Sequence, residues 1–205
     1  MKVGIVEVGY GNIPSLKRAC TNSGFEAHKV DTPESLSEID RLILPGVGAF
    51  PGAMKSLRES GLLEAIKFFV EVQHKPILGI CLGAQLLFES SEEEIYTAGM
   101  GLLEGRVRHL QTASFPAKIP HTGWSETRFV RRFGVFHEGA KVPFYYNHSF
   151  FFTCESNQVI CELETSNRIA TGVSRDNILA FQFHPEKSLD QGFGALMEFF
   201  GDCVV

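Results

Sequence analysis

The chain has 205 residues, of which 44% are hydrophobic and 21% are charged, so it holds enough apolar material to bury a substantial core. At about 100 to 200 residues per domain, this length predicts one domain over residues 1–205. The formal net charge is −5, with acidic and basic residues interspersed, which argues against nucleic acid and an anionic membrane surface as partners.

The N-terminal stretch MKVGIVEV enters a strand pattern directly and lacks the apolar core of a signal peptide. No apolar run approaches the length that spans a bilayer. The five cysteines are odd in number and lack the CxxC spacing of a zinc site or a redox pair. We therefore expect a cytoplasmic protein without a metal site or a cofactor.

The first half of the chain alternates apolar runs with amphipathic stretches. Strands are predicted at Val3–Val8, Phe25–Val30, Arg41–Leu44 and Pro76–Ile80, and helices between Asn12 and Gly24 and over Met54–Val72. This alternation predicts an α/β fold, in which helices cover both faces of a mixed, mainly parallel sheet. Ligands of such sheets bind at the carboxyl ends of the strands.

The second half consists mostly of predicted strands, some of them antiparallel. They cover Gly105–Leu110, Phe144–Thr153, Val159–Thr165, Arg168–Ser174 and Ile178–Phe183, and a closing helix covers Phe193–Phe200. No repeat or linker separates the two halves, so we expect them to share one sheet. The acidic run Glu92–Glu94 is typical of a solvated face.

Cys81 lies in a G-x-C-x-G motif, from Gly79 to Gly83. This is the thiol counterpart of the nucleophile elbow, in which glycines relieve crowding where a strand turns into a helix. Such a turn points the side chain outward, and the peptide dipoles at a helix N-terminus favour a reactive thiolate. Gln85 follows one helical turn later, within reach of whatever Cys81 attacks.

A histidine and a glutamate that could activate this thiol follow a later apolar strand. His184 and Glu186 are two residues apart, so in an extended segment their side chains point to the same side. With Cys81 they would meet at the carboxyl ends of two strands and form a Cys-His-Glu triad, in which Glu186 orients the imidazole.

Backbone N–H groups that could hold a developing oxyanion follow another strand end. Gly46, Val47 and Gly48 form a turn whose two glycines let N–H groups point inward. The amide of Leu82, directly after the nucleophile, offers a second donor. Together with the triad, these donors predict a site for acyl transfer.

Each of these parts also has a simpler interpretation. Cys81 alone fits a small core hydrophobe, and the His184–Glu186 pair fits a surface pair or half of a metal site. The glycines at 46 and 48 fit a plain turn. The coincidence of all three parts at predicted strand ends favours the catalytic interpretation.

The segments PGVGAF, GICLGAQLLF and FQFHPEKS together resemble the class I glutamine amidotransferases, whose fold is flavodoxin-like. The resemblance covers nearly the whole chain and includes VGYGN, GMGLLEG and NHSF. The segment IPHTGW at 119–124 indicates the branch of the family whose members dock on a (β/α)8-barrel cyclase in histidine biosynthesis.

The resemblance implies that L-glutamine is the substrate and that Cys81, His184 and Glu186 hydrolyse its side-chain amide. It also implies that the backbone of residues 46–48 lies near the oxyanion. The residues implied to bind glutamine are Gln85, His148, Ser149 and Phe150, and those implied to face the cyclase are Asn12, Trp124, Tyr145 and Lys187.

A partner is also expected on chemical grounds. Water would protonate the released ammonia and destroy its nucleophilicity, so the ammonia must reach its acceptor enclosed. A domain of this size has no room for a synthase module, which predicts a second chain whose ligand is coupled to glutamine hydrolysis. The resemblance implies that this chain is the cyclase, in a heterodimer.

Departures from the family pattern leave the acceptor open. Many members have VDYGxGN, PHMGWN and GICLGMQ where this chain has VEVGYGN at 6–12, PHTGWS at 120–125 and GICLGAQ at 79–85, and valine where it has Asn147. One alternative is a paralogous glutaminase that feeds ammonia to the amidation of a surface-polysaccharide sugar. Two others are a stand-alone cysteine hydrolase or peptidase on the same scaffold and a non-catalytic regulatory module.

Overall fold

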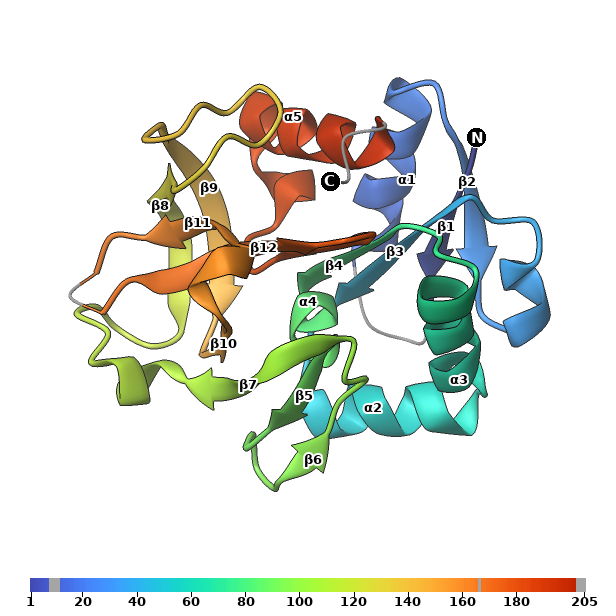
Figure 1. Ribbon diagram of the computed structural model, residues 1–205, viewed down its shortest axis with the longest axis horizontal. Coiled ribbons are helices and arrows are strands. Elements are labelled where there is room, and N and C mark those ends of the chain that lie inside the picture. The colour runs from blue at the N-terminus through green and yellow to red at the C-terminus, as the bar shows by residue number, and fades with distance from the viewer. Residues whose placement is uncertain (8–11, 166, 202–205) are drawn as a thin grey trace.

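The computed structural model describes residues 1–7, 12–165 and 167–201. Its main feature is a large mixed sheet with helices on both faces (Figure 1). From one edge to the other, the strands are β2 (Glu26–Val30), β1 (Lys2–Val6), β3 (Arg41–Gly46), β4 (Ile77–Cys81), β13 (Ile178–Phe181), β12 (Ile169–Arg175), β11 (Val159–Leu163), β8 (His121–Phe129) and β9 (Lys141–His148).

Parallel and antiparallel pairing divide this sheet at β13. From β2 to β13 neighbouring strands run parallel, and from β13 to β9 they run antiparallel. The predicted α/β fold with a mixed sheet shared by both halves is confirmed. The predicted strand end at Val8 and most of the VGYGN segment lie outside the described residues.

A smaller sheet packs beside the large one and was not predicted. Its strands, in order, are β10 (Phe150–Thr153), β7 (Leu103–His109), β5 (Phe88–Ser91) and β6 (Thr97–Ala98). The single strand predicted over Phe144–Thr153 is wrong, because the chain leaves the large sheet after His148 and enters the small sheet at Phe150. Ser149, between β9 and β10, is therefore the residue at which the backbone crosses from one sheet to the other.

The helices also differ from the prediction at two places. They are α1 (Ile13–Asn22), α2 (Phe50–Glu59), α3 (Leu62–Lys67), α4 (Leu82–Leu86) and α5 (Leu189–Phe200), with short 3-10 turns η1 (Pro33–Leu36), η3 (Leu110–Ala113), η4 (Ser156–Gln158) and η5 (Pro185–Lys187) and a π turn η2 (Phe68–Val72). The helix predicted over Met54–Val72 is interrupted at Gly61, whose φ of +75° ends an α-helix. The closing helix begins at Leu189 rather than at Phe193, and Asn12 precedes α1 without a side-chain capping bond.

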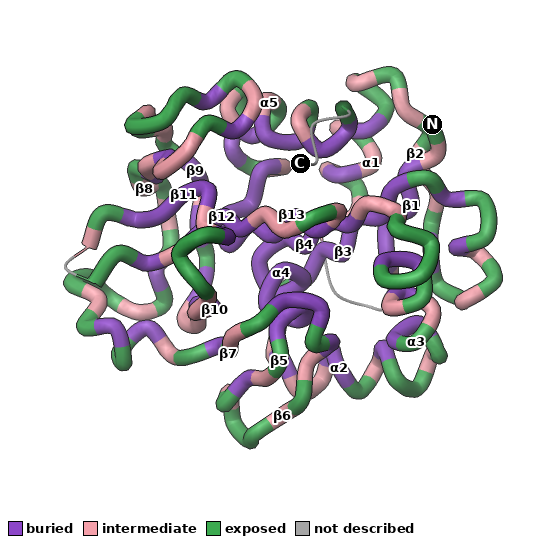
Figure 2. Tube along the Cα trace, in the orientation of Figure 1, coloured by how far each residue is buried: buried purple, intermediate pink, exposed green. Residues whose placement is uncertain are grey.

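Both faces of the central strands are buried (Figure 2). Alternation along β3 places Leu42 and Leu44 in an apolar cluster with α2 and α3, and places Ile43 in a second cluster with α1 and α5. The strands are therefore held from both sides, which fixes the positions of their carboxyl ends.

Within the described ranges, none of the helices is both long and apolar enough to cross a bilayer.

Candidate active site

Cys81 is the last residue of β4 and immediately precedes α4. Its backbone has φ +55° and ψ −112°, a conformation that a residue with a side chain rarely adopts. Two glycines make the turn possible, since a Cβ at Gly79 would lie 2.6 Å from Ala84 Cα, and one at Gly83 would lie 1.8 Å from the Leu44 carbonyl oxygen. This strained and tightly packed corner has the geometry predicted for a nucleophile elbow.

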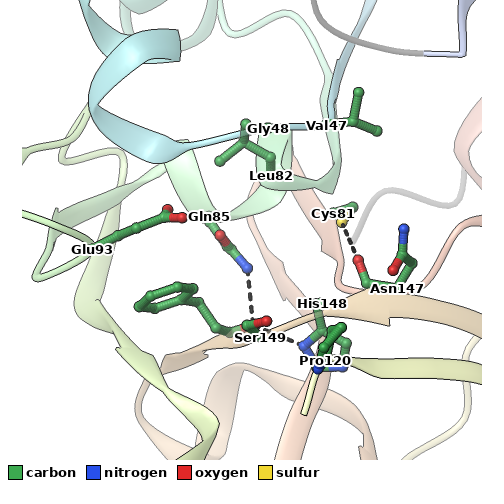
Figure 3. Close-up of a pocket in the computed structure, with 11 residues that line it drawn as sticks. Val47, Gly48, Cys81, Leu82, Gln85, Glu93, Pro120, Asn147, His148 and Ser149 are labelled. Carbon is green, nitrogen blue, oxygen red and sulfur yellow. Dashed lines mark hydrogen bonds between the residues drawn. The ribbon is translucent and has the colours of Figure 1, made fainter.

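A cavity of about 220 Å³ opens beside Cys81 (Figure 3). Its walls come from the β3–α2 loop, from α4, and from the crossing between β9 and β10. The residues that line it are Val47, Gly48, Cys81, Leu82, Gln85, Glu93, Pro120, Asn147, His148, Ser149 and Phe150. The cavity thus gathers all four residues predicted to bind glutamine, and Gly46 lies next to it as the neighbour of Cys81 across β3 and β4.

His184 follows β13, and Glu186 lies in η5 directly after it. The Nδ1 atom of His184 is 2.9 Å from Oε1 of Glu186, and each side chain is 2% exposed. Burial by itself lowers the pKa of His184, but interactions with Cys81 and Glu186 more than offset this effect and raise the pKa to about 9. The structure therefore brings Cys81, His184 and Glu186 together.

Gln182, which was not singled out in the sequence, links Cys81 to Gln85. Its side chain is fully buried, its Nε2 donates to Sγ of Cys81 at 3.8 Å, and its Oε1 accepts from Gln85 Nε2 at 3.0 Å. Gln85 Nε2 also donates to the carbonyl oxygen of Phe150 at 3.0 Å, which fixes the orientation of its amide. A glutamine between two phenylalanines signals a strand, and the pattern does not reveal its partners.

Glu93 is a second residue that sequence reasoning missed. Its Oε2 accepts a hydrogen bond from the backbone N–H of Phe50 at 2.9 Å, and burial raises the pKa of its carboxyl group. The solvated face predicted for Glu92–Glu94 is wrong at this position, because Glu93 lines the cavity. In a run of three glutamates, nothing local distinguishes the one that turns inward.

Three of the four predicted interface residues form a surface patch beside His184, which we call the aromatic patch (Trp124, Tyr145 and Lys187). The Trp124 and Tyr145 rings meet edge to face with centroids 6.2 Å apart, and Lys187 Nζ lies 5.5 Å from the Tyr145 ring centroid. The indole is 47% exposed. Asn12 stands on a different element, at the start of α1.

A thiol next to an imidazole that a carboxylate orients can attack a carbonyl carbon while the imidazole takes the thiol proton. Across the described ranges, no group of three or more His, Cys, Asp or Glu side chains is arranged to hold a metal ion. The fold is α/β, and the thiol, imidazole and carboxylate at this corner are the groups that a cysteine nucleophile would use. Residues 5–201 match the class-I glutamine amidotransferase family, and the chain belongs to that family.

Curated relatives match over nearly their whole length. The imidazole glycerol phosphate synthase subunit HisH of Sulfurimonas denitrificans is 41% identical, with 96% of each chain covered. The subunit of the same name from Bacillus cytotoxicus is 40% identical over 97% of this chain and 94% of the relative. HisH 1 of Campylobacter jejuni is 37% identical over 96% of this chain and 98% of the relative. The resemblance seen in the sequence motifs is confirmed.

Solved structures agree on the fold. A glutamine amidotransferase crystal structure aligns with a TM-score of 0.78 at 22% identity, covering 97% of this chain and 96% of the other. The PurLQS structure from Thermotoga maritima aligns with a TM-score of 0.77 at 21% identity and covers 97% of both chains. At such identities the likeness establishes the architecture alone.

Proposed function

We propose that this chain is the glutaminase subunit of imidazole glycerol phosphate synthase, which hydrolyses L-glutamine and passes ammonia to a (β/α)8-barrel cyclase in histidine biosynthesis. The names of the relatives, which match along nearly the whole chain, support the pathway. The observation that carries the proposal is the joint placement of Cys81, His184 and Glu186 beside a cavity at the carboxyl edge of the sheet.

In the proposed reaction, Sγ of Cys81 attacks the side-chain amide carbon of glutamine, and His184 takes the thiol proton. His184 then gives a proton to the departing nitrogen, the C–N bond breaks, and ammonia leaves a glutamyl thioester. Water, activated by the same imidazole, attacks the thioester and releases glutamate and the thiol. Glu186 holds the ring at Nδ1 throughout, so that Nε2 carries the proton in each step.

Backbone amides are the proposed stabilisers of the oxyanion. Leu82 directly follows the nucleophile. Like Val47 and Gly48, it lines the cavity. Gly48 has φ +116°, a conformation that favours glycine. Donors fixed in place before the reaction stabilise the charge that develops on the carbonyl oxygen, and removal of one such donor costs about 10²-fold or more in kcat in other enzymes.

The far end of the cavity suits the amino-acid end of glutamine. Gln85 and the backbone of His148, Ser149 and Phe150 offer hydrogen-bonding groups there. The Glu93 carboxylate, on the same wall as Gln85 in Figure 3, supplies a charge of the sign that an α-ammonium group requires. We therefore assign Glu93 to the substrate ammonium group.

The aromatic patch is the proposed start of the cyclase interface. An exposed indole, a tyrosine and a lysine are residue types that protein interfaces use as anchors or at their rims. The Tyr145 ring centroid lies 6.4 Å from that of His184, so a cyclase seated on the patch would close over the catalytic corner. Ammonia could then leave without meeting bulk water. We include Asn12 in this interface on the family resemblance.

The first test is ammonia release from L-glutamine, with and without the cyclase of the same organism and its nucleotide ligand. We expect release to need the cyclase, and Cys81→Ala to lower it by about a thousandfold or more. Cys154→Ala is the matched control, because Cys154 is a free, half-buried thiol outside the cavity. Undiminished activity of Cys81→Ala would refute the triad, whereas glutaminase activity that ignores the bound cyclase would indicate a different acceptor enzyme.

A further inference from the structure

A chain of hydrogen bonds runs from β8 into the wall of the cavity at Cys81. The Oγ atom of Ser125 is 2.8 Å from Nε2 of His121, whose Nδ1 is 3.0 Å from Nε2 of His148. The remaining ring nitrogen of His148, Nδ1, is 2.8 Å from the carbonyl oxygen of Phe150. Both histidines are buried, at 8% and 5% exposure.

Only one arrangement of hydrogens satisfies this chain when both rings are neutral. A carbonyl oxygen can only accept, so His148 carries its hydrogen on Nδ1 and presents a lone pair at Nε2. His121 must then donate from Nδ1, and its own Nε2 must accept from the Ser125 hydroxyl. Burial lowers the pKa of His121 and lowers that of His148 to about 3, so both rings are neutral at physiological pH.

This row of hydrogen bonds ends at Phe150, in the segment where the backbone passes from the large sheet to the small one. The Phe150 carbonyl oxygen accepts from Nδ1 of His148 and also from Nε2 of Gln85. Ser149, the residue before Phe150, lines the cavity together with Asn147, whose carbonyl oxygen lies 3.8 Å from the Cys81 sulfur. The orientation of the His148 ring therefore bears on the part of the wall that faces the nucleophile.

The row of hydrogen bonds begins with two residues of the same strand, β8. Residues four apart on a regular strand have Cα atoms about 13 Å apart, too far for a histidine and a serine side chain to meet. Between His121 and Ser125 lies Gly123, whose φ of +127° is outside the strand region. The pairing of β8 with β9 continues through this glycine, and the serine hydroxyl lies within hydrogen-bond distance of the imidazole.

We propose that His121 and Ser125 are positioning residues for the glutamine site, which hold His148 in its Nδ1–H tautomer and thereby fix the crossing at 147–150. The inference rests on the proposed function for its substrate. Neither residue lines the cavity, so their effect on glutamine passes through His148.

The experiment combines kinetics of the complex with the tautomer state of the isolated protein. We expect His121→Ala to raise the KM for L-glutamine about tenfold and Ser125→Ala about threefold, with smaller changes in kcat, because each leaves a buried ring nitrogen without its partner. Ser125→Thr, which keeps the hydroxyl, should restore the wild-type KM. Ser37→Ala removes an exposed hydroxyl far from the site and serves as the control.

Nitrogen-15 NMR of the histidine rings supplies a readout that a purely structural role would not move. We expect wild-type His148 and His121 to carry hydrogen on Nδ1, and His121→Ala, which removes the donor at Nε2 of His148, to shift part of His148 toward the Nε2–H form. A wild-type His148 protonated on Nε2 would overturn the inference. If the wild-type complex hydrolyses glutamine and neither His121→Ala nor Ser125→Ala changes its KM, the inference is also overturned. If the wild-type complex has no glutaminase activity, the proposed function fails and the inference fails with it.

Discussion

The hydrogen bond that reaches the Cys81 sulfur comes from a residue type that is rarely expected to act on a thiol. The amide of Gln182 is turned by its acceptor role toward Gln85, so that its N–H group points at the sulfur. A donor in this place stabilises the negative charge of the thiolate, independently of His184. Gln182 is therefore the residue outside the triad that we expect to affect Cys81 most directly.

Replacement of Gln182 by methionine, which has a similar length and no N–H group, tests this contact. Loss of one hydrogen bond to a charged atom predicts about a tenfold slower alkylation of Cys81 by iodoacetamide at neutral pH. The rate is read by mass spectrometry of the Cys81 peptide. Gln158→Met, at another buried glutamine, should leave the rate unchanged, and an unchanged rate in Gln182→Met itself would contradict the assignment.

At the scale of elements, the turn from β4 to α4 depends on the close approach of β3. A Cβ at Gly83 would lie 1.8 Å from a backbone oxygen of Leu44, and backbone cannot move aside as a flexible side chain can. We expect Gly83→Ala to lower the free energy of unfolding by about 3 kcal/mol or more, or to prevent folding. Chemical denaturation followed by circular dichroism measures the change.

A glycine within α5 provides the control for this substitution. A Cβ at Gly194 would meet its nearest atom, Cζ of Phe136, at an ordinary contact distance of 3.4 Å. Alanine is the better helix former by about 1 kcal/mol, so Gly194→Ala should be neutral or stabilising. Equal stability of the Gly83→Ala and Gly194→Ala proteins would show that the corner is not constrained as described.

Elements with a strong local signal were predicted, and those whose boundaries depend on tertiary packing were not. The buried strands β3 and β4 are continuous apolar runs, which identify them directly. By contrast, β8 reads HTGWSETRF, with few apolar residues, and is a strand because β9 and β11 pair with it. The division of Phe144–Thr153 between two sheets has no local cause either, since both parts are strongly strand-forming.

At the scale of the molecule, the sequence predicted the components of the site that follow strand ends. Cys81 and Gly46 are the last residues of apolar strands, and Gly48 and His184 follow such strands closely, so the parallel topology directs them to one edge. His121 and Gln182 escaped prediction because His148 and Cys81, with which they interact, lie on neighbouring strands but far away in the sequence. Such partners become visible only when the register of the strands is known.

The whole molecule also has a predicted response to acid, which arises from His148. Burial is the main reason why the pKa of this residue falls from 6.5 to about 3; the hydrogen bond to the Phe150 carbonyl opposes the fall, and repulsion from protonated His121 or His184 adds to it. The unfolded chain therefore binds a proton at His148 before the folded chain does. The stability that depends on a neutral His148 ring is fully present above pH 6.5. The free energy of unfolding falls as the pH is lowered from 6.5 toward 3.

We expect this residue to account for a loss of about 2 kcal/mol between pH 6.5 and pH 5, at 1.36 kcal/mol for each pH unit. Denaturant unfolding at pH 7 and pH 5 should therefore show a smaller loss in His148→Gln than in the wild type, by about that amount. Effects of carboxyl groups are common to both proteins and cancel in the comparison. His137→Gln, at an exposed histidine, should lose as much stability as the wild type. If His148→Gln does so too, the ring is not held neutral in the folded protein, and the one-way chain of donors through His121 cannot exist as described.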